Sequence, residues 1–328
     1  MRIAVVGMGN LGSAVALVAA KNGHEVLAWD YSQTVVDEIN QHQTNGAFLA
    51  NKAFPITVIA SHDLPAVLDK PLELLLITLP SQFIEPVFSL AELKAGVAIV
   101  NMSKGLDVAS HETVVQSLQR KWPHNPIAML SGPSLANEFA YGVATGFVVA
   151  SESRNIQHKV AEVFNNEHIA VRFSDDLLGV ELGGILKNIY ALGLGAVDTH
   201  PQSGLNFKGA YLSLAFQEIK KIAGCLGAQP QTFDDISGLG DLMATMFSEH
   251  SHNRSMGKWL AKGLSIDDIA AKMPVLAEGY GSLKVVINMA EKHQLSIPLA
   301  QLINNLVDQL ITLDEFYKQF VVLLKSAP

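Results

Sequence analysis

The chain is poor in cysteine and in basic residues, and both shortages limit what it can be. Among its 328 residues it has a single cysteine, Cys225, so an intrachain disulfide is impossible and a reducing compartment fits. We expect Cys225 to be a small buried side chain. Acidic residues outnumber basic ones, and the net charge of −8 argues against a nucleic-acid partner.

Long apolar runs and metal-ligand spacings are also missing. No uninterrupted apolar run reaches the roughly 18 residues that span a bilayer, and no basic region precedes the first apolar segment. The 11 histidines do not fall into a zinc-binding spacing, so we expect no metal. We therefore expect a cytoplasmic protein without a transmembrane segment.

The most informative segment is the first twelve residues. The apolar run 3–6 is typical of a buried strand, and Gly7, Gly9 and Gly12 follow it as G-x-G-x-x-G. These glycines permit a tight turn, close approach of a pyrophosphate, and close packing of the next helix. The start of that helix, at Asn10 and Leu11, offers N–H groups and partial positive charge to phosphates. The alternative is a Gly-rich turn without a ligand.

An acidic residue follows the second predicted strand, 25–29. Asp30 lies 18 residues after Gly12, where this motif places a carboxylate for the adenosine ribose 2′-OH. A carboxylate would repel a 2′-phosphate, so we predict that NAD is preferred over NADP. The alternative is an ordinary surface aspartate, but the order strand, turn, helix, strand and acid favours the dinucleotide.

Apolar strands alternate with helical patterns through the first half of the chain, and only helical patterns follow residue 174. Strands separated by helices indicate right-handed crossovers and a mostly parallel sheet. We predict an α/β fold, with an N-terminal Rossmann-type doubly wound sheet over 1–174 and an all-α domain over 175–328. The predicted strands are 3–6, 25–29, 55–60, 73–78, 97–101, 127–131, 146–150 and 169–173. The predicted helices include 11–22, 175–197, 211–226, 253–262, 266–273 and 281–293.

Two loops at the carboxyl ends of predicted strands carry polar residues. Lys104 precedes a glycine after the fifth strand and can present an ammonium to an anion; a solvated loop lysine is the alternative. After the sixth strand, Gly132 and Pro133 shape a turn, and Ser134 is a plausible N-cap. A simple helix cap is the alternative to a second set of N–H groups facing a ligand.

A lysine inside a Gly-rich, otherwise apolar helical pattern is the candidate acid–base group. Lys187 is bracketed at helical spacing by Glu181 and Asn188. Such a lysine must extend its amine to water, pair with an acid, or do chemistry. Burial lowers the pKa of a lysine and makes it a usable proton donor and acceptor. Asp241, which follows the Gly-rich segment 237–240, could orient it.

The segment Ser251-His252-Asn253-Arg254 begins a predicted helix. Ser251 is the predicted N-cap, and the first-turn N–H groups with the three following side chains form a candidate anion site. The alternative is that Ser251 merely caps the helix and Arg254 merely lies on the surface.

Taken together, these segments resemble the NAD(P)-dependent glycerol-3-phosphate dehydrogenase family over nearly the whole chain. The family has an N-terminal Rossmann domain and an all-helical C-terminal domain, and many members are dimers. Its members interconvert dihydroxyacetone phosphate and glycerol 3-phosphate. The most specific matches are Ser103-Lys104-Gly105, 132–138, 184–188, 238–242 and Ser251-x-Asn253-Arg254.

The resemblance implies a role for each matching residue. Lys187 and Asp241 would be catalytic, with Lys187 at the substrate oxygen. The substrate site would be lined by Lys104, Gly132, Ser134, Lys187, Asp241, Ser251, His252 and Asn253. The cofactor would be held by Gly7, Gly9, Asn10, Leu11, Gly12, Asp30, Lys104, Ala136, His252, Leu276 and Glu278.

The sequence departs from the family pattern at several places. His252 stands where the family has an arginine that contacts phosphate groups. Asp30 and Tyr31 occupy the turn where bacterial members commonly carry an arginine that favours NADP. The family's Asp-Gly after the catalytic helix becomes Asp198-Thr-His200, and the usual Arg-Gly is absent around 214–216.

The sequence thus predicts an oxidoreductase that uses NADH to reduce dihydroxyacetone phosphate, a small phosphorylated three-carbon substrate. The resemblance implies a homodimer. Two alternatives stay open. One is a related dehydrogenase for another small hydroxy compound. The other is a nucleotide-binding paralogue that has lost turnover, which His252 mildly favours and which the presence of Lys187, Asp241 and Asn253 opposes.

Overall fold

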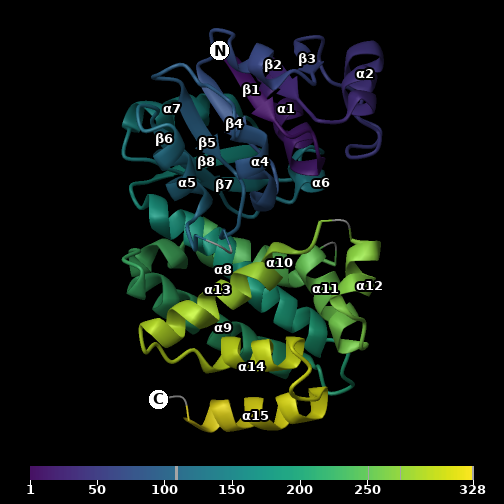
Figure 1. The fold of residues 1–328 in the computed structure, drawn as a ribbon, viewed down its shortest axis with the longest axis vertical. Helices are drawn as coiled ribbons and strands as arrows, with labels where there is room; N and C mark the ends of the chain where they lie inside the picture. The colour runs from purple at the N-terminus through teal and green to yellow at the C-terminus, as the bar shows by residue number, and fades with distance from the viewer. Residues whose placement is uncertain (108–109, 250, 274, 327–328) are drawn as a thin grey trace. The chain divides into compact units, whose positions relative to one another are not determined.

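The fold is given by a computed structural model that describes residues 1–107, 110–249, 251–273 and 275–326. The chain divides into two compact units (Figure 1). Unit 1 comprises Met1–Lys104 and Thr113–Glu181, and unit 2 comprises Gly105–Glu112 and Leu182–Pro328. One helix, α8 (Leu177–Val197), begins in unit 1 and continues in unit 2.

Unit 1 is built on an eight-stranded sheet in the order β3-β2-β1-β4-β5-β6-β7-β8. Neighbouring strands are parallel except β6 and β7, which are antiparallel. This is the strand order of a doubly wound Rossmann sheet with two added strands, so the predicted fold class is confirmed. The strands are β1 (Arg2–Val6), β2 (Glu25–Trp29), β3 (Val58–Ser61), β4 (Leu74–Ile77), β5 (Ala98–Asn101), β6 (Ile127–Ser131), β7 (Thr145–Ala150) and β8 (Ile169–Ser174).

Helices connect these strands and cover the sheet, as buried parallel strands require (Figure 1). Helix α1 (Asn10–Lys21) is buried from Gly12 to Ala20 and contacts α6 and α7. Gly23, at φ +88°, follows its C-cap Asn22, where a glycine commonly ends a helix. The other helical segments of unit 1 are α2 (Gln33–His42), α3 (Leu64–Leu68), η1 (Ser81–Phe83), α4 (Ile84–Phe88), α5 (Val114–Lys121), α6 (Ala136–Phe139) and α7 (Arg154–Phe164).

Unit 2 is helical, and its described part contains no strand after residue 182, as predicted. Ser265 caps α12 in a reciprocal capping box with Asp268, which confirms the predicted start of that helix. The elements after α8 are α9 (Leu205–Cys225), η2 (Pro230–Asp234), η3 (Ile236–Gly240), α10 (Asp241–Phe247), α11 (His252–Ala261), α12 (Ile266–Lys272), α13 (Glu278–Lys292), α14 (Pro298–Val307) and α15 (Leu313–Ser326).

Helix α8 is the one described helix that is long and apolar enough to cross a membrane by length and composition. However, 89% of its apolar window is buried inside the protein. Because the core helix of a soluble protein has the same composition, this burial favours a core role for α8.

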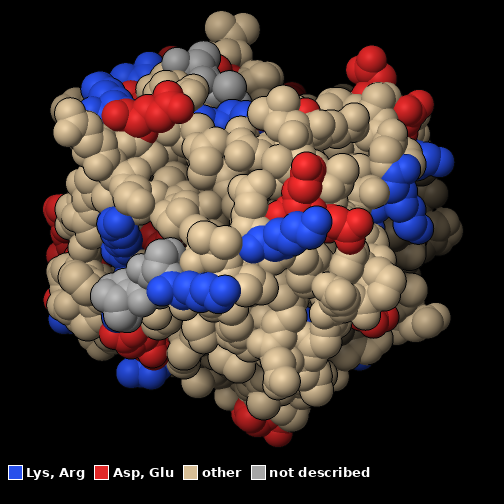
Figure 2. Space-filling view, turned by 90° about the horizontal axis from the view of Figure 1, so that it is seen from below, with Lys and Arg blue, Asp and Glu red and all other residues tan. Residues whose placement is uncertain are grey.

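The last helix leaves part of its apolar surface uncovered. Helix α15 buries Phe316 and Phe320 but exposes Val321, Val322 and Leu324. In the view of Figure 2, uncharged residues cover most of the surface that is shown. The expectation for Cys225 was wrong, since this free thiol at the end of α9 is exposed.

Candidate active site

The Gly-rich turn in unit 1 requires its glycines for different physical reasons. Gly7 has a φ of +99°, a backbone conformation that other residues rarely adopt. A Cβ on Gly12 would lie 1.8 Å from the carbonyl oxygen of Gly7, so only glycine lets α1 start this close to the turn. A Cβ on Gly9 would meet no heavy atom within 4 Å, which leaves open space beside the first turn of α1.

This open space fits the phosphates of a dinucleotide. Gly9 is the N-cap of α1 and has no side chain with which to cap the helix. The N–H groups of Asn10, Leu11 and Gly12 lie in the first turn, where a helix offers donors without intrahelical partners. These donors and the helix dipole suit a pyrophosphate. The residues that the sequence predicts for the phosphates are therefore compatible with that ligand.

Asp30 anchors the Gly-rich turn. Its Oδ2 accepts a hydrogen bond from the N–H of Met8 at 2.8 Å, and its Oδ1 accepts one from the N–H of Ser32 at 2.9 Å. Buried Asn45 supports the same turn, since its Nδ2 donates to the carbonyl of Met8 at 2.8 Å and to Ser13 Oγ at 2.9 Å. Asp30 is only 6% exposed, so it is not the ordinary surface aspartate of the alternative interpretation.

Side-chain hydrogen bonds fix the loop after β5, which carries Lys104. Asn101 Oδ1 accepts a hydrogen bond from the N–H of Ser103 at 3.0 Å, and Ser103 Oγ donates to the carbonyl of Leu79 at 2.5 Å. Lys104 follows directly and is half-buried. These hydrogen bonds fix the backbone of Lys104 at the carboxyl end of β5, and ligands of doubly wound sheets bind at the carboxyl ends of the strands.

The turn after β6 differs in one respect from its prediction. Gly132 has a φ of +140°, and a Cβ there would lie 2.5 Å from the carbonyl oxygen of Gly146, so the turn requires glycine. The N-cap of α6 is Leu135 and not Ser134, because α6 begins one residue later than the sequence suggests. Ser134 is half-buried, and its hydroxyl is therefore not used as the predicted cap.

In unit 2, Lys187 and Asp241 form a buried ion pair. Lys187 is 6% exposed and Asp241 is 2% exposed, and Lys187 Nζ donates to Asp241 Oδ1. A charged lysine is tolerated in such a place when a carboxylate partner compensates for lost hydration. The structure thus decides between the options for Lys187: its amine is paired, and the partner is the predicted one.

A rare helical turn places Asp241 at this position. Segment η3 (Ile236–Gly240) is a π-helix, and α10 begins with Asp241 directly after it. The turn packs tightly on α8, since a Cβ on Gly183 would lie 2.8 Å from the carbonyl oxygen of Ser237. Short π-helical turns occur frequently at functional sites. Gly183 in α8 therefore serves close approach by η3.

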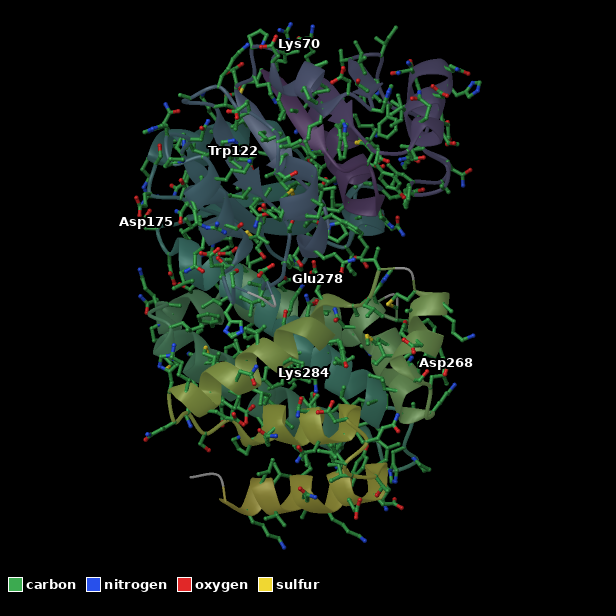
Figure 3. All side chains as sticks on the ribbon, in the orientation of Figure 1. Lys70, Trp122, Asp175, Asp268, Glu278 and Lys284 are labelled. Atoms are coloured by element: carbon green, nitrogen blue, oxygen red, sulfur yellow. The ribbon has the colours of Figure 1, made fainter. Side chains whose placement is uncertain are left out.

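The start of α11 is organised around Asn253. Ser251 caps the helix as predicted, accepting a hydrogen bond from the N–H of Arg254 at 3.4 Å. Asn253 is buried, and its Oδ1 accepts the N–H of Gly279 at 2.8 Å. That contact joins α11 to the first turn of α13, which Glu278 begins (Figure 3). His252 is exposed at the helix start.

Arg254 does not behave as either sequence interpretation predicts. It is buried, and its Nη2 lies 2.5 Å from Asp198 Oδ2, while its Nη1 donates to the carbonyl of Ser248 at 2.9 Å. Both terminal nitrogens of its guanidinium therefore bind protein groups, and Arg254 is not a surface side chain. Asp198 is not among the predicted site residues. It belongs to the segment Asp198-Thr-His200, where the sequence departs from the family's Asp-Gly pattern.

Glu181 is a second residue whose role the sequence did not disclose. It lies in α8, the helix that carries Lys187, and its Oε1 accepts a hydrogen bond from the N–H of Val115 at 2.8 Å, in the first turn of α5. Burial raises the pKa of Glu181 to about 7, against hydrogen bonds from Thr113 and Val115 that lower it. Glu181 is thus a buried partner of a helix N-terminus within unit 1.

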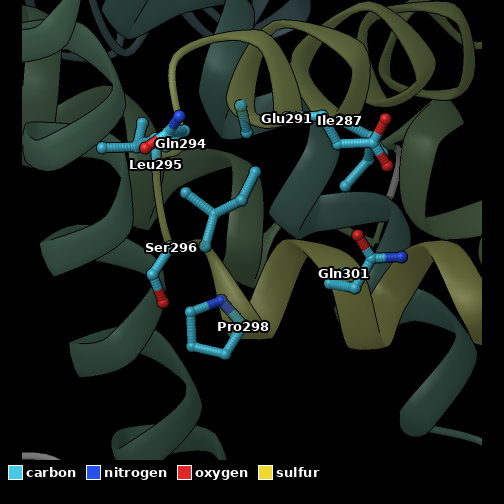
Figure 4. Close-up of a pocket in the computed structure, with 9 residues that line it drawn as sticks. Ile287, Glu291, Gln294, Leu295, Ser296, Pro298 and Gln301 are labelled. Atoms are coloured by element: carbon cyan, nitrogen blue, oxygen red, sulfur yellow. The ribbon is translucent and has the colours of Figure 1, made fainter.

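A shallow pocket of about 380 Å³ lies elsewhere in unit 2, between the end of α13 and the start of α14 (Figure 4). Its lining includes Glu291, Gln294, Ser296 and Gln301, and contains none of the predicted site residues. Among the described residues, no group of three or more His, Cys, Asp or Glu side chains is placed to hold a metal ion.

A Rossmann sheet with a Gly-rich phosphate turn, joined in sequence to a helical unit with a buried lysine–aspartate pair, defines a nicotinamide-dependent dehydrogenase. Comparison with known proteins makes this class specific. The N-terminal family model of NAD-dependent glycerol-3-phosphate dehydrogenase matches residues 2–157, and the C-terminal model matches residues 176–318. The chain belongs to this family.

Individual relatives agree over nearly the full length. The chain is 34% identical over 312 residues to glycerol-3-phosphate dehydrogenase [NAD(P)+] of Enterococcus faecalis, covering 93% of this chain and 91% of that one. It is 31% identical over 322 residues to the enzyme of the same name from Staphylococcus carnosus, covering 97% and 96%. The crystal structure of glycerol-3-phosphate dehydrogenase from Coxiella burnetii superimposes with a TM-score of 0.87 at 28% identity, covering 98% of both chains.

Proposed function

We propose that this protein interconverts dihydroxyacetone phosphate and sn-glycerol 3-phosphate by hydride transfer, and that it prefers NAD(H). The observation that supports this most strongly is the buried contact between Lys187 and Asp241 in a chain that belongs to the family by both of its domains. Such a pair provides an ammonium at a fixed position, and this ammonium can serve as the proton donor of carbonyl reduction.

A bound nicotinamide cofactor supplies the hydride of this reaction. Lys187 holds a proton at Nζ and gives it to the carbonyl oxygen of the substrate as the carbonyl carbon is reduced. Asp241 holds the amine in place through its carboxylate and stabilises the ammonium before transfer. In the reverse direction, Lys187 accepts the hydroxyl proton of glycerol 3-phosphate. Fixed positioning contributes to the rate together with the proton transfer.

The remaining predicted residues would bind and orient the two ligands. In unit 2, the start of α11 would bind the substrate phosphate through Ser251, His252 and Asn253, while Leu276 and Glu278 would contact the cofactor. In unit 1, the first turn of α1 would bind the pyrophosphate, and Asp30 would accept the ribose 2′-OH. The residues proposed for the loops after β5 and β6 are Lys104, Gly132 and Ser134 for the substrate, and Lys104 and Ala136 for the cofactor.

The decisive experiment follows NADH oxidation with dihydroxyacetone phosphate in wild-type protein and in Lys187→Ala. We expect the variant to lose about 10² to 10⁴ in kcat, because an acid–base group is removed. NADH affinity, measured by fluorescence, should survive. Near-wild-type kcat in a folded variant would remove Lys187 from the mechanism.

Substrate profiling separates this proposal from its two alternatives. Turnover of an unphosphorylated ketone in preference to dihydroxyacetone phosphate would indicate a related dehydrogenase. Binding of NADH without turnover of any ketone would indicate a paralogue that has lost activity.

We also propose that the protein is a cytoplasmic homodimer. The free, exposed thiol of Cys225 suits a reducing compartment, and the family resemblance supports the dimer. The exposed apolar side chains Val321 and Leu324 of α15 support such a contact. Light scattering coupled to size-exclusion chromatography should give twice the 35.3 kDa mass of the chain, and a monomer at micromolar concentration would contradict the dimer.

A further inference from the structure

Asp198 is a buried carboxylate that directly follows α8, and it holds two cations at once. Its Oδ2 lies 2.5 Å from Arg254 Nη2, and its Oδ1 lies 2.9 Å from Lys208 Nζ. Ser203 Oγ donates to Oδ1 at 3.0 Å. The side chain of Asp198 is 7% exposed and that of Arg254 is 10% exposed, so their interaction is shielded from water. Asp198 therefore links the end of α8 with α9 and α11.

Arg254 belongs to the first turn of α11, the turn that the proposed function assigns to the substrate phosphate. Its backbone N–H donates to the cap Ser251, and its Nη1 donates to the carbonyl of Ser248. The side chain of Arg254 thus binds both Ser248, in the segment that precedes the helix, and Asp198. Through these bonds Asp198 fixes the backbone on both sides of His252 and Asn253.

Glycine contacts along α8 make the position of α11 sensitive to this interaction. A Cβ on Gly195 would lie 2.2 Å from the carbonyl oxygen of Arg254, and a Cβ on Gly257 would lie 2.0 Å from that of Leu192. The two helices therefore meet backbone against backbone, with no long side chain between them. A shift of Arg254 must then move the helix start itself.

We propose that Asp198 is a positioning residue for phosphate recognition, acting through Arg254 to hold the first turn of α11 in its binding geometry. This inference rests on the proposed function. Burial alone would raise the pKa of Asp198, but hydrogen bonds from Lys208, Ser203 and Arg254 outweigh it and hold the pKa below its usual value. The carboxylate thus stays charged throughout a neutral assay range.

The test compares Asp198→Asn with wild type in dihydroxyacetone phosphate reduction. Asparagine keeps the size of the side chain but removes the charge that holds Arg254. We expect KM for dihydroxyacetone phosphate to rise about tenfold or more, because small misplacement of binding groups is costly. KM for NADH should stay unchanged, and kcat should change less than about threefold, since Lys187 and Asp241 keep their contact.

Asp314→Asn is the matched control. Asp314 Oδ1 also pairs with a basic side chain, lying 2.9 Å from His200 Nε2, but its own side chain is 78% exposed. We expect this variant to keep the wild-type KM. An equal rise in KM for both variants would overturn the inference, because it would indicate a general effect of lost carboxylates.

Two further variants test whether the effect passes through Arg254. The double variant Asp198→Asn/Arg254→Gln should raise KM no more than the larger single effect, whereas fully additive effects would overturn the inference. Should Asp198→Asn fail to fold, Arg254→Lys takes its place. It keeps the charge but cannot reach Asp198 and Ser248 together, so the same rise in KM is expected, and an unchanged KM would refute the inference.

Inorganic phosphate provides a readout that does not require turnover. Phosphate should raise the Tm of wild-type protein and should raise that of Asp198→Asn much less. Equal or tighter phosphate binding by Asp198→Asn would overturn the inference, whatever the activity. Absence of turnover in wild-type protein that still binds phosphate would instead refute the proposed function, so the two failures are distinguishable.

Discussion

Replacing Glu181 by glutamine should make the protein more stable above neutral pH and leave it almost unchanged at pH 5. Glu181 is 1% exposed, and burial raises its pKa to about 7 from an unfolded value of 4.5. A raised pKa means that the folded state binds its proton more tightly than the unfolded state does. The contribution of this proton is fully present below pH 4.5 and is lost as pH rises through 7.

The size of the effect follows from the shift. A difference of about 2.5 pKa units corresponds to about 3 kcal/mol at 1.36 kcal/mol per unit. Roughly two-thirds of this free energy of unfolding is lost between pH 5 and pH 7, where the unfolded chain has released the proton and the folded chain has not. Glutamine does not titrate and keeps a carbonyl oxygen for the N–H of Val115, so the variant should lack this loss.

Urea unfolding of both proteins at pH 5, 6.5 and 8 measures the prediction. Tryptophan fluorescence is a suitable signal, because Trp122 is the C-cap of α5, the helix whose start contacts Glu181. The stability of Glu181→Gln relative to wild type should increase steadily with pH. A difference that is constant across the range, or that grows toward acid, would refute the reasoning.

Three further predictions concern the cofactor, the phosphate and the packing of helices. Because Asp30 would accept the ribose 2′-OH and repel a 2′-phosphate, kcat/KM with NADH should exceed that with NADPH; a ratio at or below one would contradict this role. Because arginine keeps its charge and offers a bidentate donor to phosphate, His252→Arg should lower KM for dihydroxyacetone phosphate. An unchanged KM would show that the side chain at position 252 does not bind the phosphate. Gly257→Ala should destabilise the protein by about 1–3 kcal/mol or more, because its Cβ would lie 2.0 Å from the carbonyl oxygen of Leu192. Gly224→Ala is the control in thermal melts: it lies in α9 with no atom within 4 Å of its Cβ, so it should be neutral or stabilising, and equal losses would argue against the clash.

Local signals made much of the fold predictable. The strands β2 and β6 have the predicted bounds, because apolar runs between turn residues leave little choice of boundary. The caps Ser251 and Ser265 were also predictable from local sequence, because a cap and its helix are adjacent in the chain. Helices α14 and α15 were not predicted, although both have apolar faces.

Interactions between distant segments were harder to foresee. The pairing of Lys187 with Asp241 could be proposed because a lysine in an apolar helix needs an acidic partner, and Asp241 follows the Gly-rich segment 237–240. Nothing in the sequence indicated that the side chain of Arg254 is buried against Asp198. An arginine in the first turn of a helix can equally well extend into solvent. The position of Ser134 shows the limit of local reasoning, because α6 is a single turn whose start depends on the surrounding fold.

The contact between Glu181 and α5 has a consequence for synthesis of the protein. The first turn of α5 contains Val115, but the carboxylate that it binds lies 66 residues further along the chain. When the ribosome has made the whole sheet through β8, this helix start is still without its buried partner. Folding of unit 1 can therefore be completed only after the beginning of α8 has left the ribosome. The N-terminal half of the protein thus depends for its final fold on the helix that carries Lys187.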